Sequence, residues 1–190
     1  MATKSARPKR RTQLKPLYDG KKMSLEKFWD FKAEDGFKYE WINGVLLASE
    51  YMMKTSELLT VVRIQEAFRH TTAAREGGAL LAETKVFLKA LNRARIPDLA
   101  YFTKEELLRS EQGEETIPKF VIEFISPTDR FKYYDDKLNE YFASGVQTVW
   151  LLDREKKRVW VFTSPKEVKI CTDDDICSAA PAIPDFQISV

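Results

Sequence analysis

One acidic residue constrains the fold of this chain more than any other feature. Glu123 lies in the apolar run Phe120–Ile125, which is typical of a strand covered on both faces. A carboxylate buried there without a partner loses several kcal/mol of hydration. We therefore expect a cation next to Glu123, either a metal ion or the basic side chain of an ordinary structural ion pair.

A second acid stands at the start of another expected strand. Asp98 follows Pro97 and precedes the apolar segment Leu99–Phe102. Taken alone, Asp98 could be a turn residue after proline. Two carboxylates on neighbouring strands, together with a strand carbonyl, offer the oxygen ligands that Mg²⁺ prefers. Asp98 and Glu123 therefore indicate a divalent-cation site, because one cation explains both acids.

Length and composition fit one globular domain. The chain has 190 residues, of which 44% are hydrophobic and 12% aromatic, enough for a sizeable core. We interpret Cys171 and Cys177 as reduced thiols of a cytoplasmic protein. No apolar run approaches the ~20 residues of a membrane span. Met1–Lys15 has no apolar stretch of the kind that a signal peptide needs.

The net charge of +2 is unevenly distributed along the chain. Six basic residues and no acidic residue lie between Met1 and Lys15, so the rest of the chain carries a net charge of −4. We expect residues 1–22 to form a basic, disordered tail, which either solubilises the protein or contacts phosphates without reading sequence. The folded domain is expected over residues 23–190.

Turn and capping signals divide the domain into strands and helices. Ser24 is a good N-cap for a short helix over Leu25–Trp29. Asn43-Gly44 favours a type I′ hairpin between Tyr39–Ile42 and Val45–Leu47. We expect main helices over residues 56–74 and 129–144, a turn over 92–96, an exposed segment over 104–116, and further strands over 79–88, 99–102, 120–125, 147–152, 159–162, 168–170 and 186–190. This order predicts an α/β fold with a mixed central β-sheet flanked by helices.

Two further polar residues are candidates for the same site. In the helix after Glu123, Lys137 lies at the edge of the apolar face, whereas Lys132 points away from that face. The stem of Lys137 can cross apolar surface and bring its ammonium group to the carboxylates; the alternative is a surface lysine. Glu40, on the hairpin strand, is the fourth candidate, and its alternative is an outward-facing strand residue.

Several other kinds of site have no support. His70 is the only histidine, which excludes His-pair zinc sites and argues against a Ser-His-Asp triad. It lies at the end of a helix, where we expect it to face solvent or cap carbonyl groups. The sequence contains no Gly-x-Gly-x-x-Gly pattern and no Gly-Lys-Ser/Thr loop, so it does not indicate a nucleotide-phosphate site.

The order of the motifs resembles that of a known family. Tyr39–Val45, Pro97-Asp98 and Val121–Pro127 are followed by the pattern Lys137-x3-Tyr141-x3-Gly145-Val146-x3-Trp150. Each piece is short, but the ordered set closely resembles the Uma-type family of putative restriction endonucleases, within the PD-(D/E)XK nuclease superfamily. The resemblance covers roughly residues 23–190.

The resemblance implies a restriction-endonuclease-like core and a set of site residues. That set comprises two metal-binding acids, Asp98 and Glu123, and a lysine on the following helix, Lys137. It also includes Glu40 as an additional acid of the metal site, expected to position a second cation or a metal-bound water. The implied cofactor is Mg²⁺, with Mn²⁺ as a substitute. Two positions depart from the wider pattern: Ile125 replaces the usual strand lysine, and Ser56 stands near the place where the family often has a histidine.

These observations lead to one primary hypothesis and two alternatives. The primary hypothesis is a metal-dependent DNA endonuclease that hydrolyses phosphodiester bonds and acts as a homodimer on the two strands of its DNA partner. The first alternative is a nuclease-fold protein that binds nucleic acid or a protein partner without cutting. The second is hydrolysis of RNA or of another phosphoester, which the sequence does not separate from hydrolysis of DNA.

Overall fold

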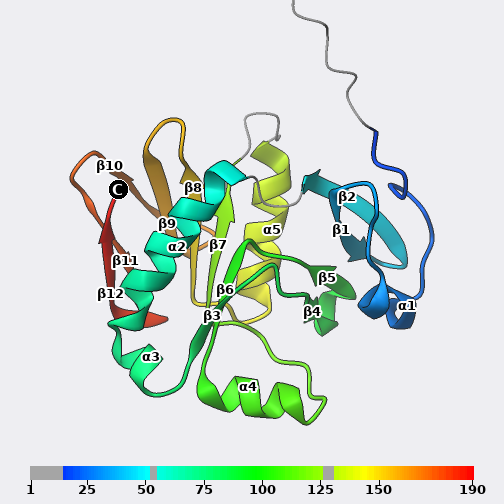
Figure 1. The fold of residues 1–190 in the computed structure, drawn as a ribbon, viewed down its shortest axis with the longest axis horizontal. Coiled ribbons are helices and arrows are strands. Elements are labelled where there is room, and N and C mark those ends of the chain that lie inside the picture. The colour runs from blue at the N-terminus through cyan, green and yellow to red at the C-terminus, as the bar shows by residue number, and fades with distance from the viewer. Residues whose placement is uncertain (1–14, 52–54, 126–130) are drawn as a thin grey trace, which may run out of the picture.

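The fold is organised around a six-stranded mixed sheet (Figure 1). The computed structural model describes residues 15–51, 55–125 and 131–190, without the side chains of residues 49–56, 131 and 132. A four-stranded antiparallel sheet lies beside the central sheet, and a two-stranded sheet ends the chain. This arrangement confirms the expected α/β class with a mixed central sheet flanked by helices.

The most apolar strands lie in the middle of the central sheet. Its order is β10 (Glu167–Thr172), β9 (Arg158–Ser164), β8 (Thr148–Asp153), β7 (Phe120–Phe124), β6 (Leu99–Phe102) and β3 (Ala79–Ala82). β7 and β8 run parallel, and helix α5 (Phe131–Ala143) provides the crossover that parallel strands require. Every residue of β7 and β8 is buried, as expected for strands covered on both faces.

Helices cover opposite faces of this sheet. On one face pack α2 (Thr55–Arg69) and the small sheet of β11 (Ile176–Ala179) and β12 (Ile183–Ser189). On the other face, α5 contributes the buried side chains of Tyr134, Leu138 and Tyr141. Side chains alternate along β7, so Ile122 and Phe124 face α2 while Val121 and Glu123 face α5.

The second sheet carries the predicted hairpin. Its order is β2 (Val45–Tyr51), β1 (Phe37–Ile42), β5 (Arg93–Arg95) and β4 (Val86–Leu88), and α1 (Leu25–Asp30) packs against it. Asn43 and Gly44 have φ values of 49° and 88°, which is the pair of positive angles that a type I′ turn needs. The Ser24 side chain accepts a hydrogen bond from the Lys27 N–H, as expected for the N-cap of α1.

The predictions for two segments in the middle of the chain were wrong. Residues 79–88 do not form one strand, because Glu83 adopts a φ of 47° and separates β3 from β4, which belong to different sheets. The expected turn over residues 92–96 contains strand β5. Asn92, with a φ of 53°, completes the turn alone and leaves Arg93–Arg95 free to pair with β1 and β4.

The structure also differs from the predictions for two helical regions. The predicted helix over residues 56–74 ends at Arg69, because Thr71 caps the separate short helix α3 (Thr72–Arg75). The expected exposed segment over residues 104–116 contains α4 (Lys104–Glu111). Its capping box between Thr103 and Glu106 is a helix-start signal that our interpretation did not use.

The N-terminal boundary of the domain lies earlier than predicted. Tyr18 packs edge-on against the rings of Phe31 and Tyr39, and Lys22 forms a β-bridge with Val45. These aromatic contacts attach part of the expected tail to the second sheet. Residues 1–14 lie outside the described residues, so the basic tail stays a prediction there. The expected start of the helix over residues 129–144, and the side chains of Ser56 and Lys132, also lie outside the described residues.

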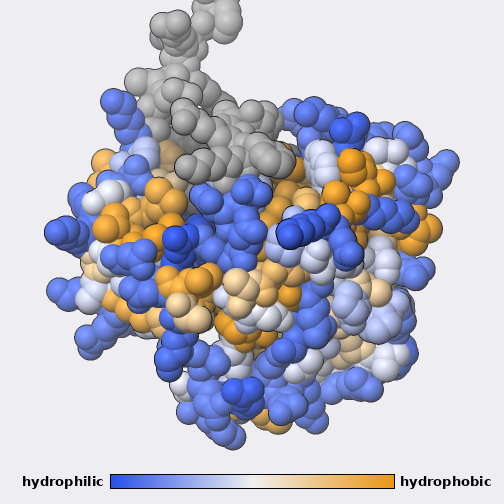
Figure 2. All heavy atoms as spheres, turned by 180° about the vertical axis from the view of Figure 1, so that it is seen from behind, coloured by the Kyte–Doolittle hydropathy of each residue, from blue (hydrophilic) through white to orange (hydrophobic). Residues whose placement is uncertain are grey.

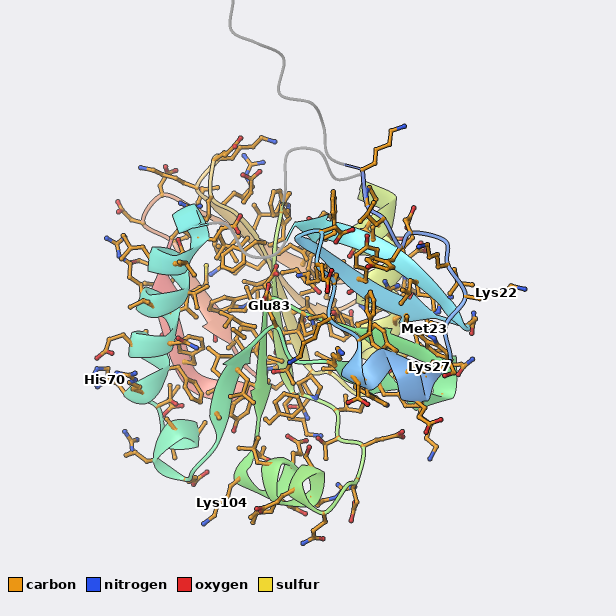
Figure 3. The ribbon with its side chains drawn as sticks, turned by 45° about the vertical axis from the view of Figure 1, so that its right-hand side comes forward. Lys22, Met23, Lys27, His70, Glu83 and Lys104 are labelled. Atoms are coloured by element: carbon orange, nitrogen blue, oxygen red, sulfur yellow. The ribbon has the colours of Figure 1, made fainter. Side chains whose placement is uncertain are left out.

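The surface seen from behind mixes hydrophilic residues with separate apolar patches (Figure 2). Within the described ranges, no helix is both long and apolar enough to cross a membrane. Cys171 and Cys177 are free thiols, and both are buried. His70, just beyond the end of α2, has an exposed side chain on the outside of the molecule, as expected for solvent exposure (Figure 3).

Candidate active site

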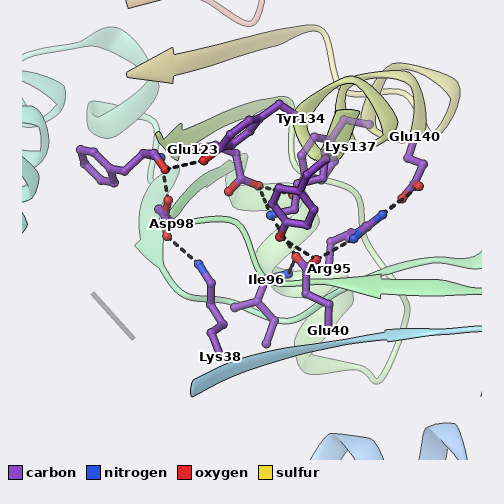
Figure 4. Close-up of polar contacts among 12 residues, drawn as sticks. Lys38, Glu40, Arg95, Ile96, Asp98, Glu123, Tyr134, Lys137 and Glu140 are labelled. Atoms are coloured by element: carbon purple, nitrogen blue, oxygen red, sulfur yellow. Dashed lines mark hydrogen bonds and ion pairs between the residues drawn. The ribbon is translucent and has the colours of Figure 1, made fainter. Parts of the chain in front are cut away.

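The four predicted site residues converge between the second sheet, the central sheet and α5 (Figure 4). They come from β1, the segment before β6, β7 and α5, and are respectively Glu40, Asp98, Glu123 and Lys137. Their exposed fractions are 0%, 4%, 1% and 1%. The alternatives of an outward-facing Glu40 and a surface Lys137 are therefore wrong.

Asp98 lies beside Glu123 because β6 and β7 are antiparallel, and the register of this pair continues to place Asp98 opposite Glu123. The Oδ2 atom of Asp98 accepts a hydrogen bond from the Phe124 N–H at 2.7 Å. Its Oδ1 atom lies 2.6 Å from the Nζ atom of Lys38, which is also buried. One oxygen of Asp98 thus holds the acid to β7, and the other holds a lysine from β1.

Glu123 is held by two side chains from α5. Lys137 Nζ lies 3.0 Å from Glu123 Oε1, and the Tyr141 hydroxyl donates a hydrogen bond to the same oxygen at 2.6 Å. Lys137 and Tyr141 are four residues apart, so they lie on the same face of the helix. The Tyr134 hydroxyl donates to the Phe124 carbonyl oxygen at 3.2 Å and ties α5 to the end of β7.

Glu40 is engaged on both carboxylate oxygens by protein donors. Its Oε1 atom accepts a hydrogen bond from the Ile96 N–H at 3.1 Å and lies 3.1 Å from Lys137 Nζ. Its Oε2 atom lies 2.6 Å from Arg95 Nη1 and accepts a hydrogen bond from the Tyr133 hydroxyl at 3.1 Å. Lys137 therefore bridges Glu40 and the carboxylate of β7.

Arg95 connects β5 to both β1 and α5. Besides Glu40, it contacts Glu140 through Nε at 2.7 Å and Nη2 at 2.8 Å, a bidentate arrangement that fits the planar guanidinium group. Arg93 also pairs with Glu140. Because Arg95 is only 2% exposed, this ion network fixes the second sheet to α5 from inside the molecule.

The electrostatic environment shifts the pKa values of Glu40 and Glu123 in opposite directions. Burial opposes the ionisation of Glu40, but Lys137 and Arg95 outweigh it and lower the pKa of Glu40 to about 2. Burial raises the pKa of Glu123, and Lys137 only partly opposes that shift. Burial alone would lower the pKa of Lys137, yet Glu123 and Glu40 raise it above its usual value, so Lys137 stays a cation.

The described site is balanced in charge without a metal ion. Its acids and bases number four each: Glu40, Asp98, Glu123 and Glu140 are paired with Lys38, Arg93, Arg95 and Lys137. Within the described ranges, no group of three or more His, Cys, Asp or Glu side chains is arranged to hold a metal ion. Asp98 and Glu123 nevertheless give two adjacent carboxylates, which suit a hard cation that takes its other ligands from water and carbonyl groups. A cation at Asp98 Oδ1 would have to displace Lys38.

The sequence interpretation missed several members of this network, notably Lys38, Arg95 and Tyr141. Lys38 is two residues before Glu40, and strand alternation would have placed both on one face. Arg95 was missed because β5 was interpreted as a turn. Tyr141 follows Lys137 by one helical turn on the apolar face of the same helix, and a buried hydroxyl there requires a hydrogen-bond partner. That requirement indicates the carboxylate of Glu123 on the facing strand β7.

Comparisons with known proteins agree with this fold. The family model described as "Uma2: Putative restriction endonuclease" matches residues 25–190. A crystal structure of a putative nuclease belonging to DUF820 from Anabaena variabilis ATCC 29413 is similar, with a TM-score of 0.71 and 17% sequence identity over 88% of this chain and 94% of that chain. A cryo-electron microscopy structure of a DrdV–DNA complex aligns with 60% of this chain and 10% of that chain, at 16% identity and a TM-score of 0.37. No curated protein gave a match.

Proposed function

Because the chain belongs to the Uma2 family of putative restriction endonucleases, we propose that it is a metal-dependent nuclease that hydrolyses phosphodiester bonds of DNA. The observation that supports this proposal is the position of Asp98 beside Glu123, next to the buried cation of Lys137. Two acids from adjacent strands and a lysine are the groups that such a hydrolysis requires.

We assign a role to each side chain of the proposed site. Asp98 and Glu123 would hold Mg²⁺ or Mn²⁺, and a bound ion of this kind supplies Lewis-acid activation of the phosphodiester and of water. Lys137 would orient the attacking water or offset the negative charge that develops on the phosphate. Glu40 would position Lys137, because both of its oxygens already have protein donors.

A plasmid assay with Mg²⁺, Mn²⁺ or EDTA tests the assignment. The wild-type protein should convert supercoiled DNA to nicked or linear forms with either ion and should be inactive in EDTA. Asp98→Ala should lower the rate about a hundredfold or more, because it removes one of two proposed ligands. The matched control is Asp135→Ala, which changes an exposed acid of α5 and should cleave like the wild type. Equal nicking by wild type and Asp98→Ala would remove the assignment.

The form of the product tests the proposed homodimer. Two copies with two-fold symmetry can cut both strands in one encounter, so linear DNA should appear without a preceding build-up of nicked circles. Analytical ultracentrifugation of the wild-type protein with uncleaved duplex in EDTA would give the stoichiometry. One copy per duplex, combined with slow conversion of nicked to linear DNA, would contradict the dimer.

A second candidate function is binding of nucleic acid without cleavage. The observation that favours it is the charge balance of the described site, in which Lys38 lies on the acid proposed to bind the metal. Crystals soaked in Mn²⁺ separate the two candidates, because anomalous scattering identifies the ion. Density between Asp98 and Glu123 would support hydrolysis. Its absence, with DNA binding but no cleavage under any metal, would favour the binding function.

A further inference from the structure

A basic hollow lies at the end of β8, outside the proposed active site. It has a volume of about 740 Å³ and is lined by α2, the turn between β8 and β9, and the last residues of β12. Four of its lining side chains are basic: Arg63, Arg154, Lys157 and Arg158. Among the described lining residues, Asp153 provides the acidic side chain, and it is engaged by the backbone N–H and the ammonium group of Lys156.

Three of the four basic side chains of this hollow are not used by the fold. Within the described part of the chain, Arg63, Arg154 and Lys157 are exposed and make no ion pair. Arg158 lies over the ring of Trp160 at 5.5 Å, and its Nε atom has no hydrogen-bond partner there. Unpaired cations gathered around a concave surface attract anions locally, even though the chain after Lys15 has a net charge of −4.

The hollow lies close to the proposed active site along the sheet. Glu123 pairs with Leu151 of the neighbouring parallel strand, and Arg154 follows three residues later. Strand geometry therefore places the backbone of Arg154 about 10 Å from that of Glu123. The hollow opens on the α2 side of the sheet and Glu123 faces α5, so a long ligand that contacts the hollow and continues across this edge of the sheet would pass beside the buried site.

We propose that Arg63, Arg154 and Lys157 bind backbone phosphates of duplex DNA beside the scissile bond. Duplex DNA carries one phosphate per about 3.4 Å of axis on each strand, so about 10 Å of duplex axis contains about three phosphates of one strand. Phosphate contacts of this kind hold the duplex in register without reading its sequence. The proposal rests on the proposed function for the identity of the ligand, but not on cleavage.

Fluorescence anisotropy with a labelled duplex in EDTA tests the proposal on the full chain. The triple variant Arg63→Gln/Arg154→Gln/Lys157→Gln should raise Kd roughly tenfold at moderate salt. The slope of log Kd against log[KCl] should decrease by about 0.9 for each phosphate that the protein no longer neutralises. Thermal unfolding of the variant should match that of the wild type, because the three side chains are exposed.

The matched control removes three exposed cations that lie outside the hollow. Lys27→Gln/Lys104→Gln/Lys166→Gln makes the same change in net charge, and none of these three residues lines the hollow. This control should retain most of the wild-type affinity and slope. Equal losses in the two triple variants would overturn the proposal, because charge alone would then explain binding. No loss in either would also overturn it, because the hollow would then contribute nothing to binding.

Single substitutions keep the test valid if the triple variant is unstable. Arg154→Lys retains the charge and should bind like the wild type, whereas Arg154→Glu should weaken binding further than Arg154→Gln. Binding of inorganic pyrophosphate that depends on Arg154 but leaves the affinity for DNA unchanged would indicate a discrete small-anion site and contradict a DNA contact. Cleavage by the wild type with unchanged binding by the variants would overturn this inference alone. Weaker binding by the variants without wild-type cleavage would support it and count against hydrolysis.

Discussion

Each acid of the proposed metal site is held by a lysine from a different element. Lys38 of β1 lies on Asp98, and Lys137 of α5 lies on Glu123, with all four side chains buried. Removing one partner of a buried ion pair leaves an uncompensated charge, which costs about 3–5 kcal/mol. The two lysines differ in what a metal ion would require of them. Within the described part of the chain, Lys137 contacts Glu123 through Oε1 alone, whereas both oxygens of Asp98 are engaged, one of them by Lys38.

We predict that Lys38→Met destabilises the metal-free protein by about 3 kcal/mol or more and tightens its binding of Mn²⁺. The ion would no longer compete with the ammonium group for Asp98. Urea unfolding with and without Mn²⁺, together with calorimetric titration, measures both effects. The control is Lys85→Met, which removes a lysine that donates to three carbonyl oxygens near α1. Lys85→Met should be less stable than the wild type, and Mn²⁺ should not restore the lost stability. Unchanged Mn²⁺ affinity in Lys38→Met would contradict competition at Asp98.

Glu40 should make the stability of the protein sensitive to acid. The pKa of this carboxyl is lowered from 4.5 to about 2, so its stabilising effect is complete above about pH 4.5 and is lost as pH falls toward 2. Glu40→Gln should lower the free energy of unfolding at pH 7 by about 3 kcal/mol and flatten its pH dependence between these values. Urea unfolding at a series of pH values measures this. Glu111→Gln, at an exposed position, should keep the wild-type acid slope; the same slope in Glu40→Gln would contradict the prediction.

The residues of the site differed in how far the sequence revealed them. Glu123 could be predicted because a charged residue in an otherwise apolar strand must have a partner. Lys137 could be predicted from its position at the edge of an apolar helix face. Lys38 and Arg95 could not be identified in the same way, because their importance depends on which strands pair and at which register. That information is distributed over distant segments of the chain.

At the scale of elements, short strands were the hardest to predict. β4 and β5 have three residues each, and each is adjacent to a turn that contains a non-glycine residue with positive φ. Three residues give too little alternation to distinguish a strand from a loop. The hairpin of β1 and β2 and the helix α5 were predicted correctly, because Asn43-Gly44 and a long apolar face are strong local signals.

The ion network of β5 predicts that a buried Arg–Glu contact contributes much more to the free energy of unfolding than an exposed one. Arg95→Met should destabilise the protein by about 3–5 kcal/mol, because it leaves Glu40 and Glu140 buried without their shared cation. The comparison is Arg109→Met, whose contact with Glu114 is about half exposed and should contribute less than about 1 kcal/mol. Urea unfolding of both variants measures the difference. Similar losses in the two variants would show that β5 is not fixed to α5 through Arg95.

At the scale of the whole molecule, positive charge is separated from the proposed active site. The buried network is neutral, the chain after Lys15 is acidic overall, and two groups of basic residues, in the N-terminal segment and in the hollow beside β8, are concentrated away from that network. If these two groups bind DNA, DNA-binding affinity and hydrolysis depend on different parts of the molecule. Long-range attraction of DNA should then depend on groups that take no part in hydrolysis.

Removal of residues 2–14 tests that separation. The deletion takes away five basic residues and changes the net charge from +2 to −3. We expect weaker DNA binding, with a salt slope reduced by about 0.9 for each phosphate left without a basic partner, and an unchanged cleavage rate once DNA saturates the protein. Anisotropy gives the affinity, and single-turnover cleavage gives the rate. A full-length variant with the five basic residues replaced by Gln controls for chain length and should behave like the deletion. Loss of cleavage at saturating DNA in both proteins would instead place the N-terminal segment within the reaction itself, since weaker attraction alone cannot slow a bound complex.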